Sequence, residues 1–273
     1  MSSRSKKKHN RLEQQVQAFF SQPALRPGAY DLPSFMELEK VEPKVLDAYA
    51  LHVLRRSRTQ AEDERTRTVV SSVLDRFVAA VKPGDISRRC HVATYALLRT
   101  LEAAGVWAFA VQGTIKVEFD PSLHLEPQYF WTHDAPDMPG AVTGHYWLVA
   151  PPFQIIDVTA RHQGWQSGEG QHVPAVLAIE GADVVRPSAE FHCAPEYRSE
   201  FPPPGPHHFA MWKWLPPLTV QVGTVRITNQ PYAIRVPPPH EDLDGVRLQA
   251  NGKTLRRFFD EEITPHLPPP IGA

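Results

Sequence analysis

The sequence has few cysteines and no long apolar segment. Only Cys90 and Cys193 occur among its 273 residues, too few for the disulfide framework of a small secreted domain. No run approaches the roughly 18 apolar residues that a membrane-spanning helix needs. The basic start, MSSRSKKKHNR, is not followed by the apolar region of a secretory signal. We therefore expect a cytoplasmic protein without a membrane partner.

The chain also lacks a dominant charge and the common metal-binding motifs. Its 29 basic and 30 acidic residues give a net charge of -1, which offers no overall attraction to nucleic acid. Basic residues gather only in residues 1–10, expected as a disordered tail, and in LRRSRT, which acidic residues follow. Neither HExxH nor CxxC occurs, so we expect no metal and no cofactor. A zinc site is the weaker alternative, because one span contains His133, Asp134, Asp137, His145, Asp157 and His162.

Proline, by contrast, is abundant. The 28 prolines exceed the usual share of about 5%, and many form pairs or triplets in the second half of the chain. Such runs cannot lie inside helices or central strands. Hydrophobic residues make up 42% of the chain and charged residues 22%, as in a globular protein with a sizeable core. The second half should therefore contain short elements joined by extended segments.

The spacing of apolar residues predicts a mixture of helices and strands. Apolar residues recur at helical spacing over residues 11–22 and 43–81, and the middle of the second range is either a charged connection or one long charged helix. Alternation predicts one or two strands over residues 106–119 and a hairpin over residues 145–160. Short strands should follow, with a last helix over residues 253–263.

A helix that begins near Cys90 is the most informative of these elements. The segment SRRCHVATYALLRTLEAAG has an apolar stripe at helical spacing, an N-cap at Asp85 or Ser87, and a stop at Gly105. A helix N-terminus, a neighbouring arginine and a paired imidazole each favour a reactive thiolate. A buried, unreactive cysteine is the structural alternative, and it is our interpretation of Cys193.

The predicted hairpin offers a partner for this thiol. If its loop is residues 150–152, Val149 faces Phe153 and His145 faces Asp157 across the two strands. Directly opposed residues share a face, with Cβ atoms about 4.5–5.5 Å apart. The carboxylate could then hold one imidazole nitrogen while the other nitrogen faces the thiol. A one-residue change in loop length would break this register.

Two blocks of the sequence combine a cysteine at a helix start with His-x-Trp and Asp-x-Thr on successive strands. The residues concerned are Cys90, Leu97-Leu98-Arg99, Gly105-Val106, Ala108, Val111-Gln112-Gly113, His145, Trp147, Asp157 and Thr159. In this order they resemble the transglutaminase-like (papain-like) superfamily of cysteine enzymes. The chain departs from that pattern at Trp107 and Val158, where the superfamily has proline. We expect the bulky Trp107 to reshape the cleft.

The resemblance implies an α+β fold in which the nucleophile helix packs on an antiparallel sheet. It places a transglutaminase-like catalytic core at residues 85–165. A helical N-terminal portion at residues 11–84 and a Pro-rich, mostly β C-terminal portion at residues 166–273 would pack around that core.

The implied function is thiol-dependent acyl transfer or hydrolysis at an amide bond of a protein or peptide, with an amine acceptor in the case of transfer. Cys90 would be the nucleophile, His145 the general acid and base, and Asp157 the partner that orients the imidazole. The backbone N–H of Cys90 would bind the oxyanion, with Gln112 or Trp147 as a second donor. The alternative is a catalytically silent transglutaminase-like fold that acts as a protein-binding module.

Overall fold

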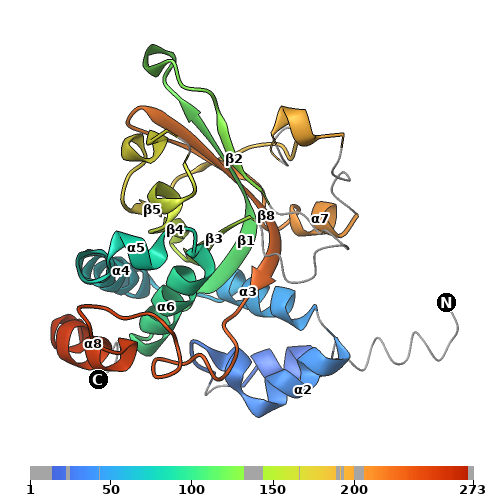
Figure 1. Cartoon of the computed structure of the whole chain (residues 1–273). Coiled ribbons are helices and arrows are strands. Elements are labelled where there is room, and N and C mark those ends of the chain that lie inside the picture. The colour runs from blue at the N-terminus through green and yellow to red at the C-terminus, as the bar shows by residue number, and fades with distance from the viewer. Residues whose placement is uncertain are drawn as a thin grey trace, which may run out of the picture.

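A curved antiparallel sheet organises the chain (Figure 1). The computed structural model describes residues 14–22, 25–42, 44–131, 144–165, 167–188, 191, 194–199 and 206–269. Within them, the strand order of the sheet is β5-β4-β3-β1-β8-β7-β6, and β2 pairs with β1 outside that path. The strands are β1 Phe109–Phe119, β2 Gln128–Phe130, β3 His145–Ala150, β4 Phe153–Asp157, β5 Leu177–Ile179, β6 Asp183–Val184, β7 Leu218–Val222 and β8 Val225–Arg235.

Helices cover both faces of this sheet, so the expected α+β class is confirmed. One buried cluster joins α4, α6 and α8 to the sheet, and a second joins α3 and the N-terminal elements to the opposite face. The helices are α2 Pro33–Val41, α3 Val45–Arg55, α4 Gln60–Ala80, α5 Pro83–Ile86, α6 Cys90–Ala103, α7 Pro206–Met211 and α8 Leu255–Phe258.

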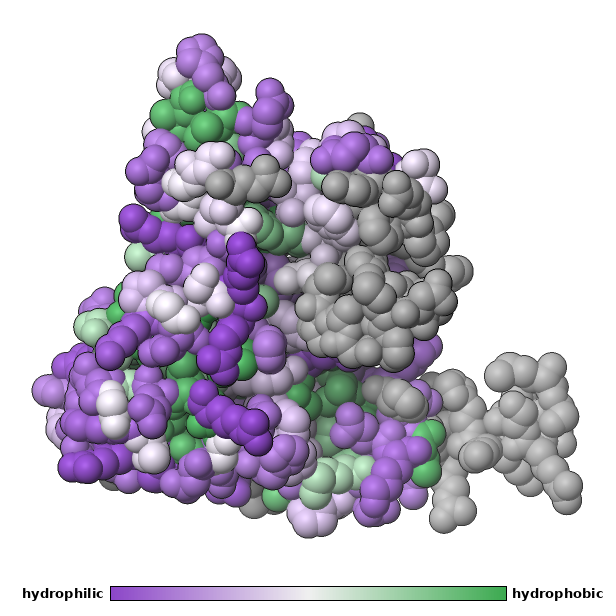
Figure 2. All heavy atoms as spheres, viewed as in Figure 1, coloured by the Kyte–Doolittle hydropathy of each residue, from purple (hydrophilic) through white to green (hydrophobic). Residues whose placement is uncertain are grey.

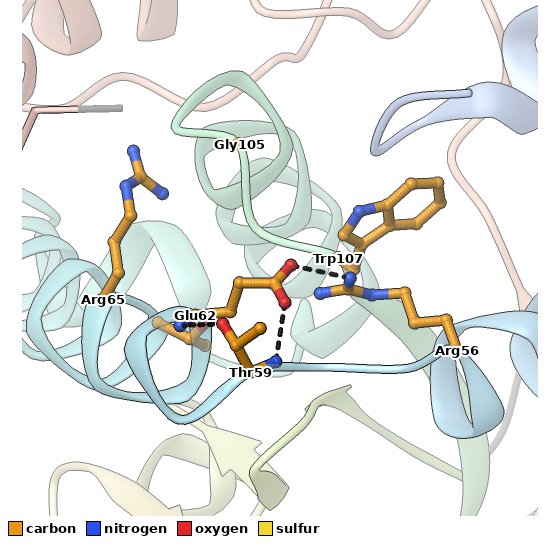
Figure 3. A pocket seen from close by; sticks show the side chains of 7 residues that line it. Arg56, Thr59, Glu62, Arg65, Gly105 and Trp107 are labelled. Atoms are coloured by element: carbon orange, nitrogen blue, oxygen red, sulfur yellow. Dashed lines mark hydrogen bonds and ion pairs between the residues drawn. The ribbon is translucent and has the colours of Figure 1, made fainter. Parts of the chain in front are cut away.

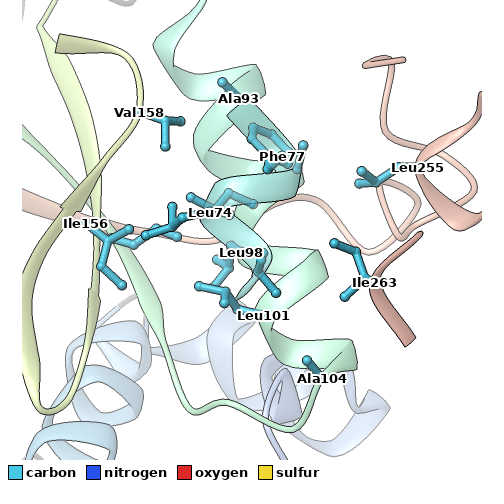
Figure 4. Packing of buried hydrophobic residues seen from close by; sticks show 14 of the residues in the cluster. Leu74, Phe77, Ala93, Leu98, Leu101, Ala104, Ile156, Val158, Leu255 and Ile263 are labelled. Carbon is cyan, nitrogen blue, oxygen red and sulfur yellow. The ribbon is translucent and has the colours of Figure 1, made fainter. Parts of the chain in front are cut away.

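Helix α6 lies between α4 and the sheet (Figure 4). Its leucines Leu97, Leu98 and Leu101 are at most 1% exposed, and each buried leucine contributes about 1.5–3 kcal/mol. They pack with Phe77 of α4 and Ile156 of β4 in one cluster. This packing holds α6 firmly, and therefore positions Cys90 at its first turn.

The helical N-terminal portion contains separate helices. Helix α3 ends at Arg55, and α4 begins after Thr59. The Thr59 hydroxyl accepts a hydrogen bond from the N–H of Glu62, whose carboxylate accepts one from the N–H of Thr59. Such a capping box satisfies N–H groups that a helix start leaves unpaired. The charged stretch is therefore a short connection followed by a capped helix.

The second half of the chain completes the same sheet. Strands β7 and β8 form a hairpin, and β8 pairs with β1 over nearly its whole length. The predicted last helix is present as α8, followed by a π-helical turn at Phe259–Ile263. The segment after β1 contains the short strand β2, which pairs with β1. Among the described residues, no helix combines the length and apolarity required to cross a membrane.

The surface shown in Figure 2 is largely hydrophilic. Smaller apolar areas interrupt it, one of them near the projecting end of the β1–β2 hairpin. The most exposed large apolar side chains of the described residues, Val41, Val184 and Phe209, belong to three different elements. Isolated apolar side chains of this kind are ordinary on a protein surface.

The β3–β4 hairpin differs from its predicted register. Ala150 faces Phe153 and Leu148 faces Ile156, with an irregularity between the two pairs. The expected pairing of Val149 with Phe153 is therefore wrong, because the loop consists of two residues, Pro151 and Pro152, and not of the three that were expected. The register moves by two residues in total, and side chains alternate with a period of two. His145, the first residue of β3, and Asp157, the last residue of β4, are therefore not directly opposite, but their side chains stay on the same face of the sheet.

Candidate active site

Cys90 is the first residue of α6. The expected N-caps are wrong, because Asp85 belongs to the separate short helix α5 and Ser87 directly follows that helix. Arg89 occupies the N-cap position without a side-chain cap bond. Arg88 has a φ of 58°, a left-handed conformation that side-chain-bearing residues rarely adopt. It turns the chain sharply, so that a new helix starts at the cysteine.

This turn contacts two other segments of the candidate site. The backbone N–H of Arg88 donates to the carbonyl of His162, 3.2 Å away, shortly after β4 ends. The thiol of Cys90 lies 3.9 Å from the carbonyl oxygen of Gly144, the residue before β3. The fold therefore brings the start of α6 next to the strand ends that carry the predicted histidine and aspartate.

His145 and Asp157 form a buried pair. Nε2 of His145 lies 2.5 Å from Oδ2 of Asp157, and the two residues are 0% and 3% exposed. Because an ionised carboxylate can only accept, Nε2 carries the proton of this hydrogen bond. Asp157 therefore selects which imidazole nitrogen is protonated when the ring is neutral.

The other carboxylate oxygen of Asp157 is held by the loop that follows β4. Its Oδ1 accepts hydrogen bonds from the N–H of Thr159 at 2.7 Å, the Thr159 hydroxyl at 3.0 Å and the N–H of Ala160 at 3.1 Å. Burial alone would raise the pKa of Asp157, but His145 and these donors outweigh burial and hold the pKa below its ordinary value. The carboxylate therefore stays ionised and fixed in orientation.

Replacing Thr159 with valine is expected to lower the free energy of unfolding by about 1–3 kcal/mol. The variant keeps the shape but removes a buried hydroxyl that donates to an ionised carboxylate. Urea denaturation at neutral pH measures the change. Thr68→Val is the matched control, since the exposed Thr68 hydroxyl bonds only to its own helix, and it should change stability by less than about 0.5 kcal/mol. Equal effects in both variants would show that the hydroxyl does not support Asp157.

The second ring nitrogen of His145 is available to the thiol. Nδ1 is buried and has no hydrogen-bond partner. Burial alone would lower the pKa of His145, but Asp157, with a smaller contribution from Cys90, outweighs burial and raises the pKa to about 10. Cys90 is therefore close enough to act on the titration of the imidazole. The three side chains can support a thiolate–imidazolium pair and a proton transfer through Nδ1.

The two expected oxyanion donors lie on opposite faces of the sheet. Gln112 pairs with Tyr146 across β1 and β3, and the neighbouring pair contains Trp147. Trp147 shares the face of His145 and stacks beside it, with ring centroids 6.3 Å apart and an interplanar angle of 19°. Gln112 lies on the face covered by α6, where its Oε1 accepts a hydrogen bond of 2.7 Å from Nε of Arg235. A substrate that approaches along one face could therefore contact only one of the two.

Tyr146 is a site residue that sequence reasoning missed. Its ring packs against Tyr95 of α6 with centroids 6.0 Å apart, and its carbonyl accepts a hydrogen bond of 3.3 Å from Thr94. These contacts fasten the first turns of α6 to β3. The alternation of β3 contains the signal, because a residue between His145 and Trp147 must point to the opposite face, towards the helix.

Trp107 does not shape the candidate site. It lines a cavity of about 430 Å³ at the opposite end of α6, together with Arg56, Glu62 and Gly105 (Figure 3). The guanidinium of Arg56 lies 5.5 Å from the centre of the Trp107 ring and 3.0 Å from the carboxylate of Glu62. A helix the length of α6 extends for about 20 Å, which separates this cavity from Cys90. The expectation that Trp107 reshapes the cleft is therefore wrong.

The residues considered for a zinc site are only partly described. His133, Asp134 and Asp137 lie outside the described residues, as does Cys193. Elsewhere in the described ranges, no three histidine, cysteine or acidic side chains gather in a metal-binding group. The imidazole of His145 is instead bonded to a single carboxylate.

Comparisons of the chain with protein-family models, with curated proteins and with solved structures found no match. Its function must therefore be inferred from the chemistry of the site.

Proposed function

We propose that the chain is a transglutaminase-like cysteine enzyme that cleaves or transfers an acyl group at an amide bond of a protein or peptide. One observation carries the proposal: buried His145 binds Asp157 through Nε2 and keeps an unpartnered Nδ1 beside Cys90. Cys90 lies close enough to raise the pKa of this ring through its charge and a hydrogen bond. A proton acceptor for a thiol needs such a nitrogen.

The first half of the reaction would form a thioester. Nδ1 of His145 already holds the proton that the thiol gave up, and the thiolate of Cys90 attacks the carbonyl carbon of the amide. The oxyanion that results is stabilised by the N-terminus of α6. The C–N bond then breaks, and the imidazolium returns its proton to the leaving amine.

The second half would release the acyl group. Water or a second amine attacks the thioester carbonyl and transfers a proton to His145. The C–S bond breaks, the thiolate–imidazolium pair is restored, and the product is a carboxylic acid or a new amide. Hydrolysis and transfer thus use the same three residues and differ in the nucleophile of this step.

The alternative of a silent binding module has less support. A buried carboxylate is costly unless it is fully bonded, and Asp157 accepts hydrogen bonds from three backbone or hydroxyl donors in addition to His145. A module without catalysis would have no use for such an arrangement beside a thiol. A reducing compartment such as the cytoplasm would keep this thiol available.

The proposal is tested by acylation with p-nitrophenyl acetate, with Cys193→Ser in every variant. We expect an acetyl thioester at Cys90, located by mass spectrometry of digests, and a burst of p-nitrophenolate equal to the amount of protein. Hydroxylamine should remove the acetyl group. Cys90→Ser is the matched control and should lose both the burst and the thioester. Acetylation that is absent, or equally fast after His145→Ala, would refute the proposed function.

A further inference from the structure

Arg235 is an exposed cation at the end of β8. Its Nε donates to Oε1 of Gln112, a side chain that is 4% exposed and belongs to the face of the sheet covered by α6. A buried amide that binds one edge of a guanidinium restricts the rotamers of a long, flexible side chain. The direction of the Arg235 head group is therefore set by the sheet.

Arg235 and Cys90 adjoin the same tyrosine. Gln112 on β1 pairs with Tyr146 on β3. The head group of Arg235, which is bonded to Gln112, therefore lies beside the strand that carries Tyr146. Burial raises the pKa of Tyr146; Arg235 lowers it through its charge and a hydrogen bond, and Cys90 raises it. The ring of His91, the residue after Cys90, packs against Tyr146 with centroids 6.1 Å apart, so the first turn of α6 and the Arg235 head group both adjoin Tyr146.

The charge of Arg235 is not neutralised by the described part of the chain. No described carboxylate lies within ion-pair distance of it. Glu241 is the acidic residue that acts on the neighbouring Tyr95, together with Arg235 and Cys90, and it forms no ion pair with Arg235. Of the five N–H groups of the guanidinium, one binds Gln112 and one serves the hydrogen bond with Tyr146, and those that remain can bind the oxygens of a carboxylate.

We propose that Arg235 binds a carboxylate of the substrate, so that the enzyme acts on amides that carry a free carboxylate a few bonds from the carbonyl under attack. This inference rests on the proposed function and specifies its substrate class. Gln112 acts as a positioning residue for the arginine in this arrangement, in place of the oxyanion role expected from the sequence.

Two alkylating probes test the inference, because they differ only in a carboxylate. Iodoacetate and iodoacetamide both form an S–C bond with the thiolate and expel iodide, and His145 keeps the proton that the thiol gave up or releases it to the buffer. The measured quantity is the ratio of the two second-order rate constants at Cys90, in the Cys193→Ser background. We expect Arg235→Gln to lower the ratio of iodoacetate to iodoacetamide by about three- to tenfold. In about 1 M NaCl, where the Debye length is about 3 Å, the difference should shrink.

Arg226→Gln is the matched control, because Arg226 is an exposed arginine at the other end of β8. Its ratio should equal that of the parent protein. A ratio unchanged by Arg235→Gln, with alkylation that still depends on His145, would overturn the carboxylate site and leave the proposed function standing. A thiol that neither probe alkylates in the folded protein would overturn both. A loss of ratio common to Arg226→Gln and Arg235→Gln would indicate general surface charge and contradict the inference.

Discussion

Replacing His145 with alanine is expected to slow alkylation of Cys90 by iodoacetamide at about pH 6.5 by at least tenfold. Asp157, acting against burial, raises the pKa of His145 to about 10, so the ring stays cationic beside the sulfur from acid to mildly alkaline pH. A cation in that position stabilises the thiolate that reacts with iodoacetamide. Without it, the rate should follow the profile of a free cysteine, whose pKa is about 8.5.

The measurement is the rate of alkylation against pH, with Cys193 changed to serine in both proteins. His91→Ala is the control, because His91 directly follows Cys90 in the chain and is exposed. That variant should alter the rate by less than about twofold. If the parent protein and His145→Ala gave the same pH profile, no thiolate–imidazolium pair would exist in the resting protein.

Replacing Glu102 with glutamine is expected to raise the stability of the protein at about pH 8.5 by on the order of 4 kcal/mol. Glu102 lies near the end of α6, where its Oε2 accepts a hydrogen bond of 2.9 Å from the Tyr30 hydroxyl and Oε1 has no partner. Burial raises the pKa of Glu102 to about 8, against the opposing charge of Arg99. Glutamine has nearly the same shape and never ionises.

The direction in which the free energy of unfolding changes with pH depends on which state holds the proton of Glu102. Between the ordinary pKa of 4.5 and the folded value of about 8, the folded protein keeps the proton of Glu102 and the unfolded chain releases it. The free energy of unfolding therefore falls as the pH rises through this window, by about 1.4 kcal/mol for each pH unit. The difference between Glu102→Gln and the parent protein should be small near pH 4.5 and largest above about pH 8.

Urea denaturation across this pH range tests the prediction. Glu64→Gln is the control, because Glu64 is exposed on α4 and its carboxylate accepts a hydrogen bond from Gln60. It should change stability by less than about 0.5 kcal/mol at every pH. Parallel stability curves for Glu102→Gln and the parent protein would mean that Glu102 does not hold its proton in the folded state.

The sequence predicted the elements that carry the candidate site because their signals are local. The apolar stripe and Gly105 predicted a helix from near Cys90, and alternation predicted the strands that contain His145 and Asp157. The predicted N-cap of this helix, Asp85 or Ser87, was wrong. The sharp turn at Arg88, which separates α5 from α6, depends on a hydrogen bond to a residue far along the chain.

What the sequence by itself determined is therefore the α+β class and the helix and hairpin of the site. The shared face of His145 and Asp157 was decided by the structure, because the two-residue loop alone would have put them on opposite faces and the irregularity between Leu148 and Ala150 restores a common face. Only the tertiary structure decided which side chains meet at the thiol. It moved Trp107 to the opposite end of α6, separated Gln112 from Trp147 on two faces, and brought Arg235 to Gln112. These contacts join residues up to 123 positions apart, and they depend on how strands pair and helices pack, which no local pattern of residues specifies.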